Sequence, residues 1–516
     1  MSDSKKLDKN GDPEIKPKKW NKYALSCAIL ASMTSILLGY DTAVMSGAGI
    51  YIKQDLKITD VQLEVLMGII NLYSLFGSAV AGRISDWIGR RYTVVISAVI
   101  FFFGALIMGI ATNYPFIMVG RFVAGVGVGF SLTIAPVYTA ELSPASFRGF
   151  LTSFPEVFIN SGVLLGYISN FAFSKLPLKL GWRVMLLVGT IPPIFMAIGV
   201  LAMPESPRWL VMQGRLGEAK RILRRTSDSP EEASERLADI KMAAGIPIEF
   251  DDDIVQVPEN NNHGKNVWRE LILYPTPAVR HILLAGVGIH FFQQASGIDA
   301  AVMYSPRIFE KAGVKSDGHK LLATIAVGFS KTIFILVAMF LLDKVGRRVL
   351  LLSSVGGMIV SVASLSIWLT IIDHNPDEKL TWAITLSILS TLSFVGWFSI
   401  GLGPIAWVYS SEIFPLRLRA QGTSMGVAMN RSISGVVTMT FLSLTNAISI
   451  GGVFFMYTGI SVVAWVFFYT MLPETRGRTL EEMQDLFGTF WRWRLRSKEL
   501  EKDRLIELEK SHHEVK

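Results

Sequence analysis

Cysteine and charge are both scarce in this sequence. Among its 516 residues there is one cysteine, and only 18% of the residues are Asp, Glu, Lys or Arg. A single cysteine, Cys27, can form no intrachain disulfide bond, which excludes a disulfide framework. The sequence also lacks an HExxH motif, a Walker A motif and any zinc-spaced set of Cys and His. Because neither an ATP-driven pump nor a membrane hydrolase has support, we expect no enzymatic activity, no metal and no cofactor.

Two further signals are missing. The first 20 residues are polar and charged, without an apolar core before a cleavage site, so they predict no cleavable secretory signal. The net charge of +8 is spread through short segments, and no basic patch is interleaved with aromatic residues. This arrangement argues against a nucleic-acid partner.

Apolar residues are abundant. They make up 51% of the chain, and the mean hydropathy is +0.42, which a soluble chain of this length would rarely show. A bilayer core about 30 Å thick needs about 20 apolar residues per helix, so the apolar runs predict about twelve transmembrane helices. The predicted spans are 22–45, 62–84, 93–112, 115–140, 151–173, 182–203, 279–304, 321–342, 348–371, 381–409, 420–446 and 451–472.

The chain contains an internal duplication. GRISDWIGRR at 82–91 returns in reduced form as FLLDKVGRR at 340–348, and YTAELSPASFRG at 138–149 returns as YSSEIFPLRLRAQG at 409–422. Because these clusters flank long apolar runs, the repeating unit is a bundle of membrane spans. The sequence therefore predicts an all-α membrane protein with twelve helices in two pseudo-symmetric halves of six. Two similar halves facing one cavity indicate a transporter.

The distribution of Lys and Arg predicts the orientation in the membrane. The N-terminal tail and the segments after spans 2, 4, 6, 8 and 10 are richer in basic residues than the opposite segments, so we expect both termini in the cytoplasm. Ser229 is a predicted helix N-cap within a hydrophilic central segment. The predicted divisions are a tail at 1–21, a six-helix half at 22–203, a cytoplasmic helical linker at 204–278, a second half at 279–472 and a tail at 473–516.

Several motifs together resemble the sugar porter branch of the major facilitator superfamily, over almost the whole chain. They are GRISDWIGRR at 82–91, RFVAGVGVG at 121–129, PESPRWL at 204–210, FFQQASGID at 291–299, GLGPIAW at 401–407 and PETRGRTLEE at 473–482. Within that branch, FPEVFIN at 154–160, Lys331 and NRSISGV at 430–436 are most similar to plant polyol and monosaccharide transporters. The resemblance implies the fold of that superfamily and a polyol or sugar substrate.

A polyol or sugar presents only hydroxyl groups, which suit amides, carboxylates and an indole ring as partners. Gln293 and Gln294 lie in predicted span 7, where Gly297 permits local unwinding before Asp299. A Gly and Pro cluster at 401–404 breaks predicted span 10 just before a tryptophan. Together with the resemblance, these features predict a substrate site formed by Glu156, Gln293, Gln294, Asp299, Lys331, Trp407 and Asn430.

Three of these residues depart from the usual sugar porter pattern. The resemblance places Gln in most relatives where this chain has Glu156, and Asn where it has Lys331 or Asp299. The change at position 156 introduces an acidic residue, and the change at position 331 introduces a basic one. We therefore predict that Glu156 and Lys331 form a compensating pair across the cavity.

Asp41 and Arg121 are charged residues inside predicted spans 1 and 4. A lone charge at the centre of a span costs about 2.5 to 3.5 kcal/mol on insertion scales, so we expect the two to be paired or hydrated. The resemblance implies an acid at position 41 in proton-coupled relatives and Asn in facilitative ones. We therefore predict that Asp41 binds and releases the coupled proton and that Arg121 changes the proton affinity of Asp41 between states. The alternative is a static ion pair that joins two helices.

A further set of charged residues is predicted at the cytoplasmic helix ends. There they can form salt bridges between helices and dock on helix C-termini, stabilising the outward-facing state. We predict that they act as gate residues. The set comprises Asp86, Arg90, Arg91, Glu141, Arg148, Asp343, Arg347, Glu412 and Arg419, with Glu205, Arg208, Arg348 and Glu474 beside them.

The sequence thus predicts a proton-coupled symporter for linear polyols and related monosaccharides, driven by the proton gradient. Its partners would be the substrate, protons and the lipid bilayer, and because one chain contains both halves, a monomer suffices. The alternatives are a facilitative uniporter with the same site and, more remotely, a non-transporting sugar receptor. We expect the plasma membrane as its location, with the vacuolar membrane as the alternative.

Overall fold

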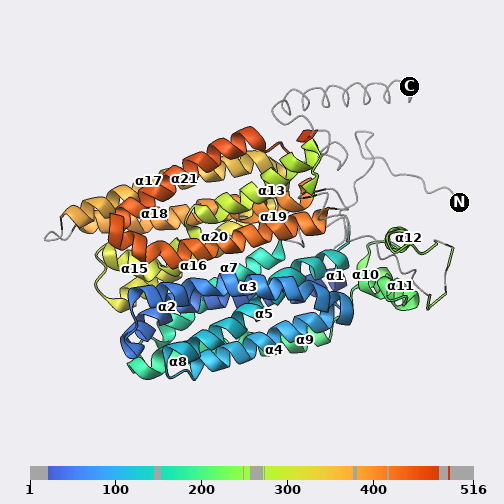
Figure 1. Ribbon diagram of the computed structural model, residues 1–516, viewed down its shortest axis with the longest axis horizontal. Coiled ribbons are helices and arrows are strands. Elements are labelled where there is room, and N and C mark those ends of the chain that lie inside the picture. The colour runs from blue at the N-terminus through green and yellow to red at the C-terminus, as the bar shows by residue number, and fades with distance from the viewer. Residues whose placement is uncertain are drawn as a thin grey trace, which may run out of the picture.

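The computed structural model of this chain describes residues 21–144, 151, 153–247, 249–250, 252–255, 271, 273–375, 380–414, 418–475 and 486–487. Long helices run side by side in an elongated bundle, and three short helices, α10 to α12, lie at one end of it (Figure 1). We call this end the linker end. The opposite end, where α2 ends and α3 begins, is the far end.

The first half contains six membrane spans. Span 1 is the continuous run of α1, a short 3-10 turn and α2, and span 6 is the pair α8 and α9. The bounds are α1 Lys22–Ser32, η1 Met33–Ser35, α2 Ile36–Leu56, α3 Asp60–Ile88, α4 Arg90–Gly109, α5 Tyr114–Leu142, α7 Phe154–Phe173, α8 Leu178–Val188 and α9 Ile191–Leu201.

Span 1 is longer than predicted. The sequence predicts an end near residue 45, whereas α2 continues to Leu56 and stops where Lys57 takes a left-handed conformation with φ 50°. Hydropathy marks only the stretch that fits an apolar layer, and the helix continues past it through the polar residues Lys53 and Asp55.

The hydrophilic centre of the chain is helical, as predicted. Its helices are α10 Pro207–Met212, α11 Leu216–Thr226 and α12 Pro230–Ala243, and they share a small apolar core that includes Leu210 and Leu223. Ser229 caps α12 by accepting a hydrogen bond from the Glu232 N–H at 3.1 Å, which confirms the predicted N-cap. Arg236 of α12 donates to the carbonyl oxygen of Glu141 at 3.1 Å and so attaches this segment to the first half.

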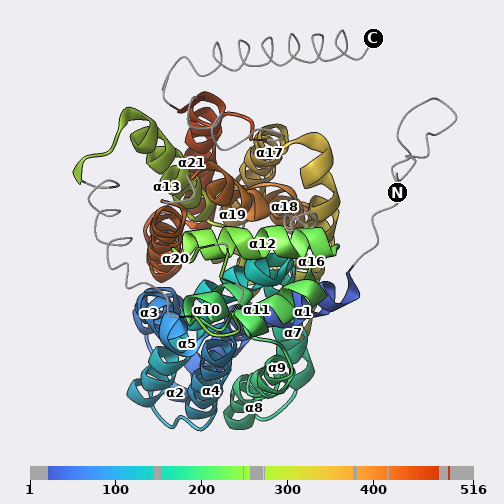
Figure 2. The same ribbon diagram turned by 90° about the vertical axis from the view of Figure 1, so that its right-hand side faces the viewer.

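The second half repeats the pattern with two interrupted spans. Span 7 is broken after α13, and span 10 is broken between α18 and α19. The bounds are α13 Pro277–Ala295, α14 Ile298–Met303, α15 Ser305–Lys311, α16 Asp317–Val345, α17 Arg347–His374, α18 Thr381–Ile400, α19 Leu402–Ile413, α20 Arg419–Ile448 and α21 Ile450–Met471. Figure 2, viewed from the linker end, shows the two halves as two groups of helices, with α12 crossing in front of the boundary between them.

Nine helical stretches of the described chain are long and apolar enough to cross a membrane. The three other predicted spans correspond to α7, α13 and α20, whose apolar character is reduced by polar residues such as Glu156, Gln293 and Arg431. Together they make the twelve helices expected from the sequence, in two halves of six. Each of these three spans carries charged or amide side chains into the bundle.

Small residues allow α2 and α7 to pack at very short range. A Cβ atom on Gly39 would overlap the carbonyl oxygen of Ile159 and would lie 2.9 Å from the backbone nitrogen of Val163. On the facing helix, a Cβ on Gly162 would overlap the carbonyl oxygen of Ile36. In each case the obstacle is backbone, so this contact requires glycine on both helices.

The two halves contact each other in the part of the bundle nearer the far end. Glu64 of α3 is 1% exposed, and its two carboxylate oxygens accept hydrogen bonds from the backbone N–H of Ser443 at 2.6 Å and from its hydroxyl at 2.5 Å. The Tyr167 hydroxyl donates to the carbonyl oxygen of Val302 at 2.6 Å. The far end is therefore closed by contacts between α3 and α20 and between α7 and α14.

Candidate functional site

A cavity lies between the two halves and is lined by both. Its empty volume is about 630 Å³, counting the space that is open to solvent. The first half contributes Leu38, Thr42, Asn71, Leu132, Glu156, Ile159 and Val163, and the second half contributes Gln293, Gln294, Asp299, Val302, Met303, Lys331, Phe398, Trp407 and Arg431. The wall therefore combines apolar surface with amide, carboxylate, cationic and indole groups.

Gln293 connects the two interrupted spans of the second half. Helix α13 ends at Ala295, and Gly297 adopts φ 82°, which glycine tolerates and most residues do not. The Gln293 side-chain N–H groups reach the carbonyl oxygens of Leu402 and Gly403 at 3.3 and 2.9 Å. These carbonyls lie just after the break in span 10, so the predicted unwinding at both sites is confirmed and one amide joins them.

The Gln293 amide is the end of a chain of hydrogen bonds that crosses both halves. Asn430 donates to the Gln293 side-chain oxygen at 2.6 Å, and the Asn430 oxygen accepts from Arg431 Nε and Nη2 at 3.0 and 2.5 Å. Arg431 Nη1 in turn donates to the side-chain oxygen of Asn71 in the first half at 3.3 Å. Asn430 is fully buried behind the cavity wall, and Arg431 lines the wall.

Four side chains in the cavity wall are formally charged: Glu156, Asp299, Lys331 and Arg431. Asp299 accepts a hydrogen bond from the Ser434 hydroxyl. Within the described chain, no ion pair of 4.0 Å or less joins Glu156 to Lys331, although both line the same cavity. The two charges are thus brought to one site, and their compensation across the cavity stays a prediction.

Trp407 is held beside the cavity by α19. Its ring lies 5.0 Å from the ring of His290, centroid to centroid, at an interplanar angle of 70°. The His290 Nε2 atom lies 3.2 Å from the hydroxyl of Ser410, one turn further along α19. His290 therefore supports the tryptophan from the side.

Asp41 and Arg121 form a buried ion pair in the first half. Arg121 Nη1 lies 2.5 Å from Asp41 Oδ2, and the side chains are 0% and 2% exposed for arginine and aspartate respectively. Arg121 also donates to the carbonyl oxygens of Leu66 and Met67 at 2.9 and 3.0 Å. The pair therefore joins α2, α3 and α5.

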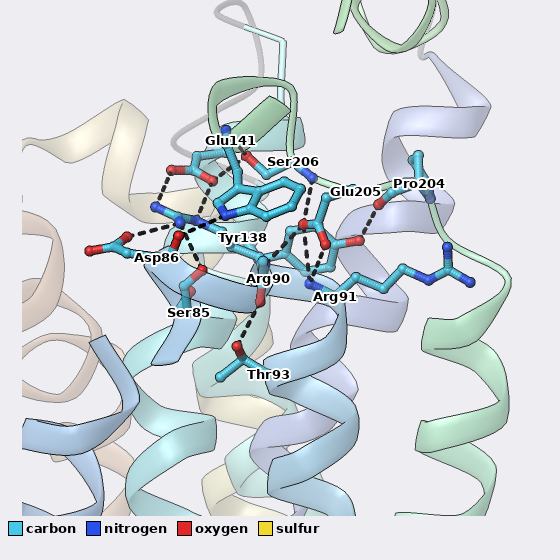
Figure 3. A network of polar contacts seen from close by, with 12 residues as sticks. Ser85, Asp86, Arg90, Arg91, Thr93, Tyr138, Glu141, Pro204, Glu205 and Ser206 are labelled. Carbon is cyan, nitrogen blue, oxygen red and sulfur yellow. Dashed lines mark hydrogen bonds and ion pairs between the residues drawn. The ribbon is translucent and has the colours of Figure 1, made fainter. Parts of the chain in front are cut away.

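At the linker end, Arg90 lies between two carboxylates (Figure 3). It donates to Asp86 at 3.0 Å and to Glu141 at 3.2 Å, which joins α4 to α5. Glu205 accepts from the backbone N–H groups of Arg90 and Arg91 at 2.9 and 3.2 Å, at the start of α4. Burial raises the pKa of Glu205, and the hydrogen bonds from neighbouring backbone N–H groups partly offset this effect.

The second half contains the same arrangement, as the duplication predicts. Arg347 donates to Glu412 at 3.1 Å, and Glu474 accepts from the backbone N–H groups of Arg347 and Arg348 at 2.9 and 3.0 Å. The ion pairs of Arg90 with Glu141 and of Arg347 with Glu412 each lie within one half. Three predicted gate residues fall outside the described part: Arg148 entirely, and the side chains of Asp343 and Arg419.

Comparison with known proteins places this geometry in a family. A sequence profile described as "Sugar (and other) transporter" matches residues 27–487, which is most of the chain. The chain belongs to the sugar transporter family.

This sugar transporter has similar relatives of known name. It is 65% identical over 479 residues to "Polyol transporter 5" of Arabidopsis thaliana, covering 93% of this chain and 88% of that one. It is 32% identical to "Glucose transporter GlcP" of Staphylococcus epidermidis, covering 90% and 97%. Among solved structures it resembles XylE, a major facilitator superfamily proton:xylose symporter, with a TM-score of 0.75, 27% identity and coverage of 91% and 100%. It is therefore a multi-pass membrane transporter of the major facilitator fold rather than an enzyme.

The transporter's structure brings most of the predicted site together. Six of the seven predicted substrate residues line the cavity, and the seventh, Asn430, lies behind Arg431. The sequence analysis passed over Arg431, although a charged residue inside a membrane span is itself a signal of function. It also passed over Glu64, the buried carboxylate that closes the far end. Like Asp41, both are charged residues inside a membrane span.

Proposed function

We propose that this protein is a secondary active transporter that carries linear polyols such as sorbitol, mannitol and xylitol, and related monosaccharides, together with protons. The observation that carries the proposal is the cavity between the two halves, whose wall offers hydroxyl-binding groups from both. The name of the Arabidopsis relative and the proton:xylose symport of XylE support the substrate class and the coupling.

The substrate contacts in this proposal come from the cavity wall. Gln294 and Asp299 accept hydrogen bonds from hydroxyl groups, and Lys331 donates to them. Trp407 covers a C–H face of the substrate, as aromatic rings do in polar binding sites. Gln293 and Asn430 support the site without contacting the substrate, because their amide groups already bind each other and Gln293 binds the backbone at the break in span 10.

Proton coupling uses Asp41. With the proton bound, Asp41 no longer holds Arg121 as a counter-ion, and with the proton released the pair re-forms. Since Arg121 also holds two carbonyl oxygens of α3, this change reaches the helix that carries Asn71 and Glu64. The two protonation states therefore favour different positions of α3, which is the requirement for coupling to a conformational change.

The orientation in this proposal places the linker end in the cytoplasm and the far end outside, in the plasma membrane. Each half, 22–203 and 279–472, moves as a unit about the cavity, and 204–278 joins them on the cytoplasmic side. The charged networks of Arg90 and Arg347 act as cytoplasmic gate elements by bracing each half. The protein works as a monomer, since one chain contains both walls of the cavity.

The proposal is tested by uptake of labelled sorbitol into cells that express the protein, at two external pH values, with and without a protonophore. One charge moving through about 100 mV provides about 2.3 kcal/mol, enough for roughly fifty-fold accumulation. We expect accumulation that increases in acid and disappears with the protonophore. Uptake that only equilibrates and ignores pH would instead establish a facilitative uniporter, and binding without uptake would indicate a receptor.

Glu64 provides a separate prediction about the outer gate. Replacing it with Ala removes both hydrogen bonds to Ser443, each worth about 1.5 to 3 kcal/mol for a charged acceptor, so the outward-open state becomes more populated. A cysteine introduced at Thr42 in the cavity wall reports this state. We expect its labelling by an impermeant thiol reagent from outside to rise at least fivefold in Glu64→Ala.

Glu64→Gln is the matched control for this experiment. Its side-chain oxygen still accepts from the Ser443 N–H, and its amide nitrogen can donate to the hydroxyl, so labelling should stay near that of Glu64. Cys27 is the one native cysteine and is buried, so a chain without the Thr42 substitution measures the background. Equal labelling in Glu64→Ala and Glu64→Gln would show that this contact does not hold the outer gate.

A further inference from the structure

The charges of the central cavity are more than a neutral substrate requires. Amide side chains can donate to and accept from hydroxyl groups without the cost of burying a charge. This cavity nevertheless contains two carboxylates and two cations, Glu156, Asp299, Lys331 and Arg431, whose formal charges cancel. In this set Lys331 and Arg431 are buried and the two carboxylates are half-buried, and such a set needs a reason beyond hydroxyl binding in general.

Arg431 is held in a fixed position with spare donors. Its hydrogen bonds to Asn430 and Asn71 use three of the five N–H groups of the guanidinium, which leaves two. The Gln294 side-chain oxygen, buried in the same wall, has no hydrogen-bond partner among the described residues. The site therefore combines a pre-positioned double donor with an unsatisfied acceptor, and a polar ligand can pair with both.

Open-chain and ring forms of a sugar differ in what they need from such a site. A ring is rigid and offers apolar faces for an aromatic side chain, whereas an open-chain polyol is flexible and carries a hydroxyl on every carbon. Binding the open chain costs about 0.5 to 1.5 kcal/mol for each flexible group that becomes fixed. Hydrogen bonds to charged groups are roughly twice as strong as neutral ones, so they can offset this cost where amides would not.

We propose that Arg431, with the carboxylates of Glu156 and Asp299, is the determinant that makes this cavity prefer acyclic polyols to the corresponding ring sugars. The guanidinium donates to two neighbouring hydroxyl groups of the chain, and the carboxylates accept from others. Asn430 and Asn71 act as positioning residues for the guanidinium. This inference rests on the proposed transport of polyols and sugars.

The test compares sorbitol with glucose, which differ by reduction at one carbon and by closure of the ring. The kcat/KM of uptake is measured for both substrates with the full-length protein and with Arg431→Gln, Arg431→Lys and the control Arg183→Gln. Arg183 pairs with Asp55 outside the cavity. We expect Arg431→Gln to lower the sorbitol-to-glucose ratio of kcat/KM at least tenfold, mainly through KM for sorbitol, with partial recovery in Arg431→Lys and no change in Arg183→Gln.

Glu156→Gln is a second test in case Arg431→Gln fails to reach the membrane, and it should shift the ratio in the same direction. Equal losses for both substrates in these variants would overturn the inference, because the residues would then serve transport in general. An unchanged ratio would overturn it too. If the unaltered protein transported neither sorbitol nor glucose, the proposed function itself would fail, and this inference with it.

Discussion

Asp41→Asn abolishes the accumulation of sorbitol above its external concentration while leaving equilibration across the membrane: this is the result we expect with the largest effect on function. Asn has nearly the same shape as Asp and can still accept a hydrogen bond from Arg121, but it cannot bind and release a proton. The roughly fifty-fold gradient available from about 100 mV should therefore fall to one. External pH should no longer change the initial rate.

The measurement is the steady-state ratio of internal to external labelled sorbitol, with exchange of preloaded label as a second readout. Asp55→Asn is the matched control, because Asp55 also pairs with an arginine of the first half, Arg183, at 3.0 Å. It lies at the far end of α2, away from the cavity, and should keep full accumulation. An Asp41→Asn protein that still accumulates sorbitol would reduce the Asp41 and Arg121 pair to a structural contact.

The largest effect on stability is expected from Gly39→Ala. The added methyl group would overlap the backbone of Ile159 on α7, and no side-chain movement can relieve a clash with backbone. Overpacking costs typically 1 to 3 kcal/mol, so we expect a loss of about 3 kcal/mol, at the upper end of this range. The α2 and α7 contact is extensive, so the variant should unfold at a clearly lower temperature than the unaltered protein.

Gly459→Ala in α21 is the control for this substitution. A Cβ atom at that position meets no other heavy atom within 4 Å, so the substitution should leave stability unchanged or raise it slightly through helix propensity. The measurement is the apparent Tm of the detergent-solubilised protein, followed by size-exclusion chromatography. Equal Tm values for the two variants would contradict the close approach of α2 and α7.

Much of the architecture could be predicted from the sequence because its signals are local. Twelve apolar runs and two copies of a charged motif predict two similar halves, and the contacts of Arg90 with Glu141 and of Arg347 with Glu412 confirm that the copies are equivalent. The break after α13 was predictable for the same reason, because glycine readily adopts the positive φ that Gly297 has at this break. Features that depend on one residue or on one repeat can be predicted without a structure.

Features that depend on which helix faces are in contact were not predictable in this way. Glu64 and Ser443 are 379 residues apart in sequence, and nothing local to either indicates the other. Asn430 and Arg431 are adjacent in one helix, yet they face different directions, so the resemblance pointed to the first while the second lines the cavity. Whether Glu156 and Lys331 meet depends likewise on the angle between α7 and α16.

The weak apolar character of α7, α13 and α20 has a consequence for how the protein is made. A helix that carries buried polar residues enters the lipid phase poorly alone and is stabilised by helices already in place. Helix α7 packs on α2 and α20 packs on α3, and both partners are synthesised earlier. Helix α13, in contrast, packs mainly on α19, α20 and α21, which emerge from the ribosome later. The packing of α13 is therefore completed only after α20 has been synthesised, so the order of synthesis delays the stable placement of this helix.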